Sequence, residues 1–280
     1  MTDESLASKY ARLCGILREM KSVLLAFSGG VDSSLLLKVA SDILGTDRLL
    51  TVTALSATTP RQELIDASDL AARLDVPHVQ FASGEMDLPE FVNNSADRCY
   101  VCKSSRFADM VKLAEERGFD FVADGTNSDD HADYRPGMRA VRELGIRSPL
   151  SEANLTKQDI RLLSRDLGLL TWNKPSYACL ASRIPYGMPI TVEKLRHVDE
   201  CEEFIRSLST TVQVRVRHHG DTARIEIDPA ELHQLIESSV RRSVIDYFKK
   251  SGFRYVAVDL EGYQMGSMNR VLDQEGEELG

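Results

Sequence analysis

The chain has 280 residues, of which 42% are apolar and 28% charged, and its net charge at neutral pH is −9. These values are typical of a globular protein with one large or two modest domains. The acidic balance argues against a protein whose main task is to bind nucleic acid. Because no apolar stretch could span a membrane and the N-terminus does not resemble a signal peptide, we expect a cytoplasmic protein without membrane association.

Helix and strand patterns alternate along the first part of the chain. Helical periodicity predicts five main helices, at 4–20, 32–44, 59–74, 101–117 and 157–167. Thr59 and Pro60 are a suitable cap and first-turn pair for the third of them. Apolar runs predict four strands, at 23–27, 49–55, 78–82 and 119–124. This order predicts an α/β fold with a doubly wound parallel sheet, in which ligands bind beyond the carboxyl ends of the strands.

The pattern changes after Trp172, so we predict two domains, at 1–172 and 173–280. Three prolines and a glycine make residues 173–189 irregular. Beyond them we expect a helix, a hairpin, a long helix and a last strand, at 191–208, 211–228, 229–250 and 255–260. These elements predict a smaller α+β domain, followed by an acidic tail, 273–280, that is expected to fray.

The stretch "AFSGGVDSSLLL", residues 26–37, joins a strand to a helix through two glycines. A helix N-terminus presents unpaired backbone N–H groups, and glycines let them approach an anion closely, so this turn predicts a phosphate site. The loop has no lysine of the G-x-x-x-x-G-K-[ST] type, and Asp32 suits Mg²⁺ instead. The alternative is a turn that only packs a helix against a strand.

The order S-G-G-x-D-S resembles the PP-loop of the ATP pyrophosphatases. In that superfamily the loop cradles pyrophosphate while ATP is cleaved between its α and β phosphates. The resemblance implies binding of ATP with Mg²⁺, and it makes Asp32 a catalytic residue. It assigns nucleotide binding to five residues of the loop, Ser28, Gly29, Gly30, Asp32 and Ser33.

Three further stretches narrow the choice within this superfamily. They are "DGTNSDDHADYRPG" at 124–137, "NKPSYACLASRIPYG" at 173–187 and "VRVRHHGDTARIEI" at 214–227. Together with the loop, in this order over nearly the whole chain, they resemble the LarE family of ATP-dependent sulfur transferases in nickel-pincer nucleotide synthesis.

This resemblance implies a specific reaction. A carboxylate of a pyridinium dicarboxylate mononucleotide is adenylylated, and sulfur then displaces AMP to leave a thiocarboxylate for the cofactor of lactate racemase-type enzymes. Asp124 and Gly125, at the end of a predicted strand, would border the nucleotide, although Asp124 equally fits a turn cap. The family also implies a homo-oligomer, either a trimer or a hexamer.

The five cysteines are an odd number, which in a cytoplasmic chain indicates metal or thiol chemistry rather than disulfides. Cys179 lies in the segment where one form of the family has a sacrificial cysteine that gives up its own sulfur. Cys99 and Cys102 add a C-x-x-C pair, and the trio resembles the form of the family with a [4Fe–4S] cluster that leaves one iron free to bind hydrosulfide. Zinc, or no metal, are the alternatives. Cys14 and Cys201 belong to apolar helix faces and are predicted core residues.

Arg215 and Arg217 alternate with valines in "VQVRVR" and should share one face of a strand, where they suit a substrate's carboxylate and phosphate. The alternative is a solvated strand face with Glu226 as the cross-strand partner. Ser182 and Arg183, close behind Cys179, are further substrate-binding candidates. We expect three histidines to be ordinary surface residues, namely His197, His218 and His219.

Two other functions remain open from the sequence. The first is another PP-loop enzyme, either a tRNA thiolase, which should carry a basic surface, or an amide-forming ligase, which needs no cysteine trio. The second is a non-catalytic nucleotide-binding sensor, which would release no pyrophosphate. The expected partner in the preferred function is a small-molecule nucleotide, and nucleic acid is not expected.

Overall fold

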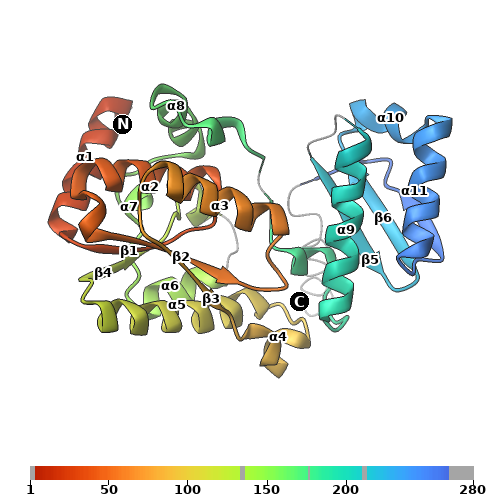
Figure 1. Ribbon diagram of the computed structural model, residues 1–280, viewed down its shortest axis with the longest axis horizontal. Helices are drawn as coiled ribbons and strands as arrows, with labels where there is room; N and C mark the ends of the chain where they lie inside the picture. Colours follow the sequence, from red (N-terminus) through yellow and green to blue (C-terminus); the bar gives the residue numbers. More distant parts are fainter. Residues whose placement is uncertain (1–3, 133–135, 176, 210–212, 265–280) are drawn as a thin grey trace, which may run out of the picture. The chain divides into compact units, whose positions relative to one another are not determined.

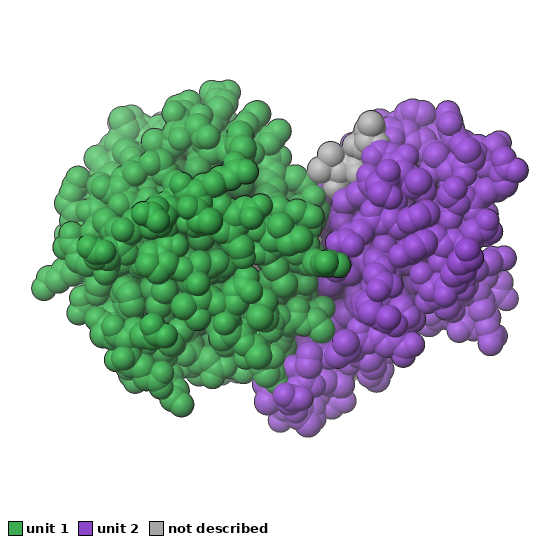
Figure 2. All heavy atoms as spheres, in the orientation of Figure 1, with its two compact units in different colours: residues 1–85, 97–177 green, residues 86–96, 178–280 purple. Residues whose placement is uncertain are grey.

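The computed structural model describes residues 4–132, 136–175, 177–209 and 213–264 (Figure 1). The chain forms two compact units, one of residues 1–85 and 97–177 and the other of residues 86–96 and 178–280 (Figure 2). The predicted domain boundary at residue 172 stays a prediction, because compactness does not establish which parts fold independently. The acidic tail lies outside the described residues.

Unit 1 contains a four-stranded parallel sheet. Its strands are β1 (Val23–Ala26), β2 (Leu49–Leu55), β3 (His78–Ala82) and β4 (Phe121–Ala123). Their order in the sheet is β3-β2-β1-β4, with β1 central and paired in parallel to both β2 and β4. The predicted parallel sheet is therefore confirmed.

Helices cover both faces of this sheet (Figure 1). Side chains alternate across a strand, so Val23 and Leu25 of β1 face one core and Leu24 faces the other. The first core is closed by α1 (Leu6–Met20), α2 (Val31–Leu44), α3 (Arg61–Arg73), α7 (Pro149–Glu152) and α8 (Lys157–Asp166). The second core is closed by α5 (Arg98–Arg117) and α6 (Gly137–Glu143). The doubly wound arrangement is therefore confirmed.

Unit 2 is built around a smaller mixed sheet. The strands β5 (Val214–His219) and β6 (Thr222–Ile227) form the predicted hairpin, and β7 (Tyr255–Val258) lies parallel to β6. Helices α9 (Val192–Leu208) and α11 (Ser238–Lys250) pack against it, through buried residues such as Val198 and Phe248. The short helix α4 (Pro89–Val92) also belongs to this unit. The predicted α+β class is confirmed.

Three helix boundaries differ from the predictions. Pro60, not Thr59, is the N-cap of α3, and there is no side-chain cap because proline has no side-chain acceptor. Helix α5 begins three residues earlier than predicted, at Arg98, so that Cys99 is helical. The long helix predicted at 229–250 is interrupted because Glu237 is extended, with φ −52° and ψ 135°, and separates α10 (Leu232–Ile236) from α11.

Candidate active site

The Gly-Gly turn joins the carboxyl end of β1 to the N-terminus of α2, as predicted. Gly29 has φ +69°, and a Cβ there would lie only 3.0 Å from the backbone nitrogen of Ala67 in α3. Only glycine fits this position without strain. Gly30 is the N-cap of α2 and has no side chain to accept from the first-turn N–H groups. The helix end is therefore suited to an external anion.

The two serines of the loop hold its shape. The hydroxyls of Ser28 and Ser33 lie 3.1 Å apart, and Ser33 Oγ also donates to the carbonyl of Gly30 over 3.2 Å. The loop after β4 approaches closely, since a Cβ on Gly125 would lie 2.9 Å from the backbone nitrogen of Ser33. The structure thus brings Gly125, which follows β4, against the PP-loop, which follows β1. This agrees with the expectation that the carboxyl ends of the parallel strands form one site.

Asp124 is buried and engaged within its own turn. Its carboxylate accepts hydrogen bonds from the backbone nitrogen of Thr126 (3.1 Å), from Thr126 Oγ1 (2.6 Å) and from Ser148 Oγ (2.7 Å). These bonds match the turn-cap alternative. A direct contact of Asp124 with the nucleotide stays a prediction.

Two lysines reach the PP-loop from distant parts of the chain. Lys157 Nζ lies 2.5 Å from Oδ2 of Asp32, and Asn127 Nδ2 lies 3.4 Å from Oδ1 of the same carboxylate. Lys174 Nζ donates to the carbonyl of Gly29 over 3.0 Å and forms an ion pair with Asp66 of α3 at 2.6 Å. Neither lysine is among the residues predicted for the site. Lys157 is the first residue of a predicted helix, where the helix dipole disfavours a cation. This unfavourable position is the sequence feature that could have indicated a role for Lys157.

A buried polar cluster around the carboxylate of Glu85 lies just beyond the carboxyl ends of β2 and β3, and it is not among the predicted site residues. Glu85 accepts from Ser56, from Ser83 and from Arg106, whose Nη2 lies 2.6 Å away. Arg106 also donates to Ser83 Oγ and Thr58 Oγ1, over 3.1 and 2.8 Å. Burial alone would raise the pKa of Glu85, but the hydrogen bonds and charge of Arg106, with the two serines, lower it to about 2.

The predicted ligand cysteines belong to both units. Cys99 is exposed and Cys102 is buried in the first turn of α5, where a spacing of three residues puts both thiols on one side of the helix. Cys179 is exposed and belongs to unit 2. Cys14 and Cys201 are buried, as predicted for core residues, and burial raises the pKa of Cys201 to about 12.

Within the described ranges, no three His, Cys, Asp or Glu side chains lie together as a metal-binding group. Cys99 and Cys102 of α5 fit two of the ligand positions of an iron–sulfur cluster, because thiolates are the ligands that such clusters use.

The predicted substrate arginines are buried in unit 2. Arg217 pairs with Glu226 at 2.6 Å, and its Nη1 donates to the carbonyl of Ser182 over 2.8 Å. Residues 214–218 of β5 are all buried, so the alternative of a solvated strand face is wrong, although its partner Glu226 is correct. Burial and the nearby charge of Arg183 lower the pKa of Arg215 to about 10.

Arg183 holds the segment that carries Cys179. It pairs with Glu202 through Nε and Nη2, over 2.8 and 2.9 Å, and its Nη1 donates to the carbonyl oxygens of Ala178 and Cys179. Glu202 also accepts from the backbone nitrogen of Val216, on the edge strand β5. Direct binding of substrate by Arg183 or Ser182 stays a prediction.

One histidine was assigned wrongly. His218 is only 7% exposed and packs edge-on against Phe253, with ring centroids 5.0 Å apart, so the predicted surface position is wrong. Burial, with the charge of Lys194, lowers its pKa. Its neighbour His219 is exposed, at the end of β5 beside the turn that leads to β6.

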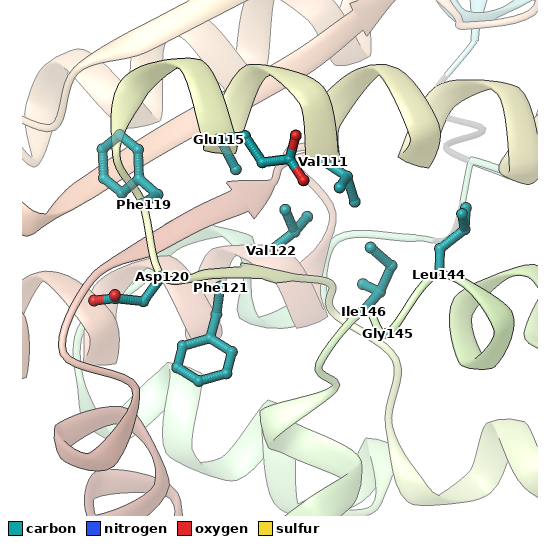
Figure 3. Close-up of a pocket in the computed structure, with 10 residues that line it drawn as sticks. Val111, Glu115, Phe119, Asp120, Phe121, Val122, Leu144, Gly145 and Ile146 are labelled. Atoms are coloured by element: carbon teal, nitrogen blue, oxygen red, sulfur yellow. The ribbon is translucent and has the colours of Figure 1, made fainter.

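A cavity of about 180 Å³ lies between the C-terminal half of α5 and the start of β4 (Figure 3). Its walls include Phe119, Phe121, Leu144 and Ile146. It is at the amino end of β4, whereas the PP-loop follows the carboxyl end of β1 in the same parallel sheet. The cavity is therefore separate from the candidate active site.

Known proteins resemble this chain over different lengths. A family model described as NAD synthase matches residues 15–100, which include the PP-loop. Over 194 residues the chain is 26% identical to a tRNA-specific 2-thiouridylase of Rickettsia africae, a match that covers 56% of this chain and 53% of that one. Over 267 residues it is 43% identical to an uncharacterized protein of Synechocystis, covering 95% and 99% of the two chains.

A third relative decides the family. The chain is 37% identical over 268 residues to the pyridinium-3,5-bisthiocarboxylic acid mononucleotide synthase of Lactiplantibacillus plantarum, and the match covers 96% of each chain. The chain belongs to the LarE family. Together with the PP-loop, LarE membership makes it an ATP-dependent sulfurtransferase, as predicted from the motifs. No helix in the described part of this LarE chain is long and apolar enough to cross a membrane.

Proposed function

We propose that the protein adenylylates a carboxylate of a pyridinium dicarboxylate mononucleotide and then replaces AMP by sulfur, forming the thiocarboxylate of the nickel-pincer cofactor. The observation that carries this proposal is the 37% identity, over 96% of the chain, to a synthase named for the bis-thiocarboxylic acid product. The glycine-dependent PP-loop at the N-terminus of α2 supports the ATP-dependent step.

The first step activates a poor electrophile. A substrate carboxylate oxygen attacks the α-phosphorus of ATP, the bond between that phosphorus and the bridging oxygen to the β-phosphorus breaks, and pyrophosphate leaves with the electron pair. The N–H groups at the start of α2, with Ser28, Gly29, Gly30 and Ser33, would bind the phosphates. Asp32 would hold Mg²⁺, which neutralises phosphate charge when bound.

The second step transfers sulfur. A hydrosulfide or thiolate sulfur attacks the acyl carbon, the carbon–sulfur bond forms, and AMP leaves with the electrons of the broken carbon–oxygen bond. We propose that Cys99, Cys102 and Cys179 would hold a [4Fe–4S] cluster, which supplies an iron without a protein ligand that binds hydrosulfide. The alternative is sacrificial Cys179. Its thiolate forms a thioester with the substrate, and its Cβ–S bond then breaks with loss of the Cα proton, so that the thiocarboxylate leaves with the sulfur and position 179 becomes dehydroalanine.

The buried arginines of unit 2 support an anionic substrate. Three arginines are buried there, Arg183, Arg215 and Arg217, and two of them form ion pairs, Arg183 with Glu202 and Arg217 with Glu226. Their guanidinium groups bring buried positive charge to this unit. Such charge suits the carboxylates and phosphate of a mononucleotide. We assign substrate binding to Ser182, Arg183, Arg215 and Arg217.

The test uses protein purified without oxygen and supplied with ATP, Mg²⁺, the dicarboxylate mononucleotide and sulfide. We expect pyrophosphate and a thiocarboxylate, the latter measured by mass spectrometry. The variant Cys179→Ala should still release pyrophosphate but form no thiocarboxylate, whereas Cys14→Ala, which changes a core cysteine of α1, should do both. Thiocarboxylate formed by Cys179→Ala would remove this thiol from the sulfur step.

Metal analysis separates the two sulfur sources. Iron and acid-labile sulfide of about four each per chain are expected for the cluster. The sacrificial route would be established instead by the absence of both elements after reconstitution, together with the loss of one sulfur and two hydrogens from Cys179 after turnover. We further propose that the protein acts in the cytoplasm as a trimer or hexamer, as the family resemblance implies.

A further inference from the structure

Lys157 has a backbone position that is fixed by several hydrogen bonds, although it belongs to neither the PP-loop nor a sequence motif. It is the first residue of α8, which begins with a reciprocal capping box between Thr156 and Asp159. The backbone nitrogen of Lys157 donates to Asp129 Oδ2 over 2.8 Å. The start of α8 is thus anchored, and the lysine side chain extends from this anchored point to Asp32, 125 residues earlier in the chain.

The helix itself gains nothing from this lysine. A cation in the first turn opposes the helix dipole, so α8 alone would favour an acidic or neutral residue at this position. The ion pair with Asp32 is also partly exposed, with 36% of the lysine side chain and 23% of the aspartate side chain accessible. Partly exposed pairs contribute little to stability and exchange partners readily. The contact therefore suits a group that moves during a reaction.

An ammonium group and a divalent cation compete for the same carboxylate. Lys157 Nζ is in direct contact with Oδ2 of Asp32, the carboxylate suited to Mg²⁺. A metal ion on that oxygen would displace the ammonium group, and phosphates bound over the first turn of α2 would offer it a new anionic partner. A lysine at that place performs the task of the lysine missing from the loop, which is to bind phosphate oxygens as charge accumulates on the leaving pyrophosphate.

We propose that Lys157 is an exchangeable cation of the ATP site. It occupies Asp32 before the nucleotide binds, yields the carboxylate to the Mg²⁺ that accompanies ATP, and then binds the departing pyrophosphate. This proposal rests on the ATP-dependent half of the proposed function and needs neither the cluster nor the identity of the carboxylate substrate.

The proposal predicts two effects of opposite direction in Lys157→Met. Mn²⁺ should bind to the nucleotide-free protein about three- to tenfold more tightly, because its carboxylate ligand has lost a competitor. The rate of pyrophosphate release should fall about 100-fold, because the phosphates have lost a cation. Electron paramagnetic resonance of free Mn²⁺ measures the first effect, and a coupled pyrophosphate assay measures the second.

A matched control is available on the same helix as Asp32. Lys38 pairs with Asp42 of α2 at 2.6 Å, away from the PP-loop. Lys38→Met should change neither the affinity for Mn²⁺ nor pyrophosphate release. Lys157→Gln, whose amide cannot replace the charge, should behave as Lys157→Met, and circular dichroism of both variants should match the parent protein.

Unchanged Mn²⁺ affinity in both Lys157 variants would overturn the exchange, whatever happens to the rate. Unchanged pyrophosphate release would equally overturn it. The proposed function fails in a different way, since a parent protein that releases pyrophosphate without forming thiocarboxylate would contradict the sulfur chemistry and leave the exchange of Lys157 intact.

Discussion

Glu85 shows how strongly a single residue can depend on its neighbours. It is fully buried, and its negative charge persists because Arg106, Ser56 and Ser83 all donate to it. Its pKa of about 2 lies below the ordinary value of 4.5. A lowered carboxyl pKa stabilises the folded state above the unfolded pKa, and this stabilisation is lost as the pH falls through the folded pKa.

The variant Glu85→Gln should therefore be less stable than the parent protein at pH 7, by about 3 kcal/mol, because the buried carboxylate that accepts from Arg106, Ser56 and Ser83 is lost. The difference should shrink as the pH is lowered from about 4.5 to about 2, where the parent protein loses the same interaction. Urea unfolding at several pH values measures both effects.

Glu143→Gln is the control, since Glu143 pairs with Arg139 at 3.7 Å and about half of each side chain is exposed. It should change stability by less than about 0.5 kcal/mol. A constant difference between Glu85→Gln and the parent protein over the whole pH range would show that the charge of Glu85 is not what stabilises this cluster.

The role of the segment 86–96 is the hardest to predict from the sequence. The residues on both sides of it belong to unit 1, whereas the segment itself packs into unit 2. Its Asn94 is fully buried with φ +57°, and its amide donates to the carbonyl oxygens of Ile184, Pro185 and Met188. The carbonyl of Asn94 accepts from the backbone nitrogen of Gly187. One side chain thus shapes the loop that follows the Cys179–Arg183 segment.

Asn94→Asp should destabilise the protein by about 2–3 kcal/mol. The substitution replaces the amide NH₂ group by a carboxylate oxygen, which cannot donate to the three carbonyl oxygens that it would face. Asn154 is a matched control, since it also has a positive φ, of +58°, but is exposed. Asn154→Asp should stay within about 0.5 kcal/mol of the parent protein. Equal effects of the two substitutions on thermal unfolding would contradict the assigned role of the Asn94 amide.

At the scale of the whole molecule, net charge helps to decide between the two kinds of sulfur acceptor named among the relatives, a transfer RNA and a mononucleotide. The tRNA-specific 2-thiouridylase match covers only 56% of the chain, whereas the mononucleotide synthase match covers 96%. A net charge of −9 opposes binding to a polyanion at physiological salt.

We therefore expect no binding of transfer RNA at 150 mM salt with a dissociation constant below about 10 µM. Filter binding of labelled tRNA measures this, and the same assay at about 20 mM salt controls for weak electrostatic contact. Submicromolar binding at the higher salt concentration would favour RNA as the substrate instead of a free nucleotide.

The sequence by itself determined the elements that depend on local pattern. The buried strands β1 and β2 are runs of leucine, valine and threonine, and α2 follows a Gly-Gly turn whose chemistry is visible in a few adjacent residues. Family motifs predicted the ATP-dependent sulfurtransferase and the LarE family correctly, because the residues of each motif lie close together in the chain. The break at Glu237 was missed, because helical periodicity continues on both sides of it.

Only the tertiary structure decided which distant side chains meet. Lys157 and Asp32 are 125 residues apart, Lys174 and Gly29 are 145 apart, and the amide of Asn94 bonds to carbonyls about 90 residues later. None of these contacts has a local pattern, since each arises when parallel strands bring their ends together or when a loop packs against another. Sequence periodicity records which face of an element is buried, whereas the partner of a buried or charged group is chosen by the folded chain as a whole.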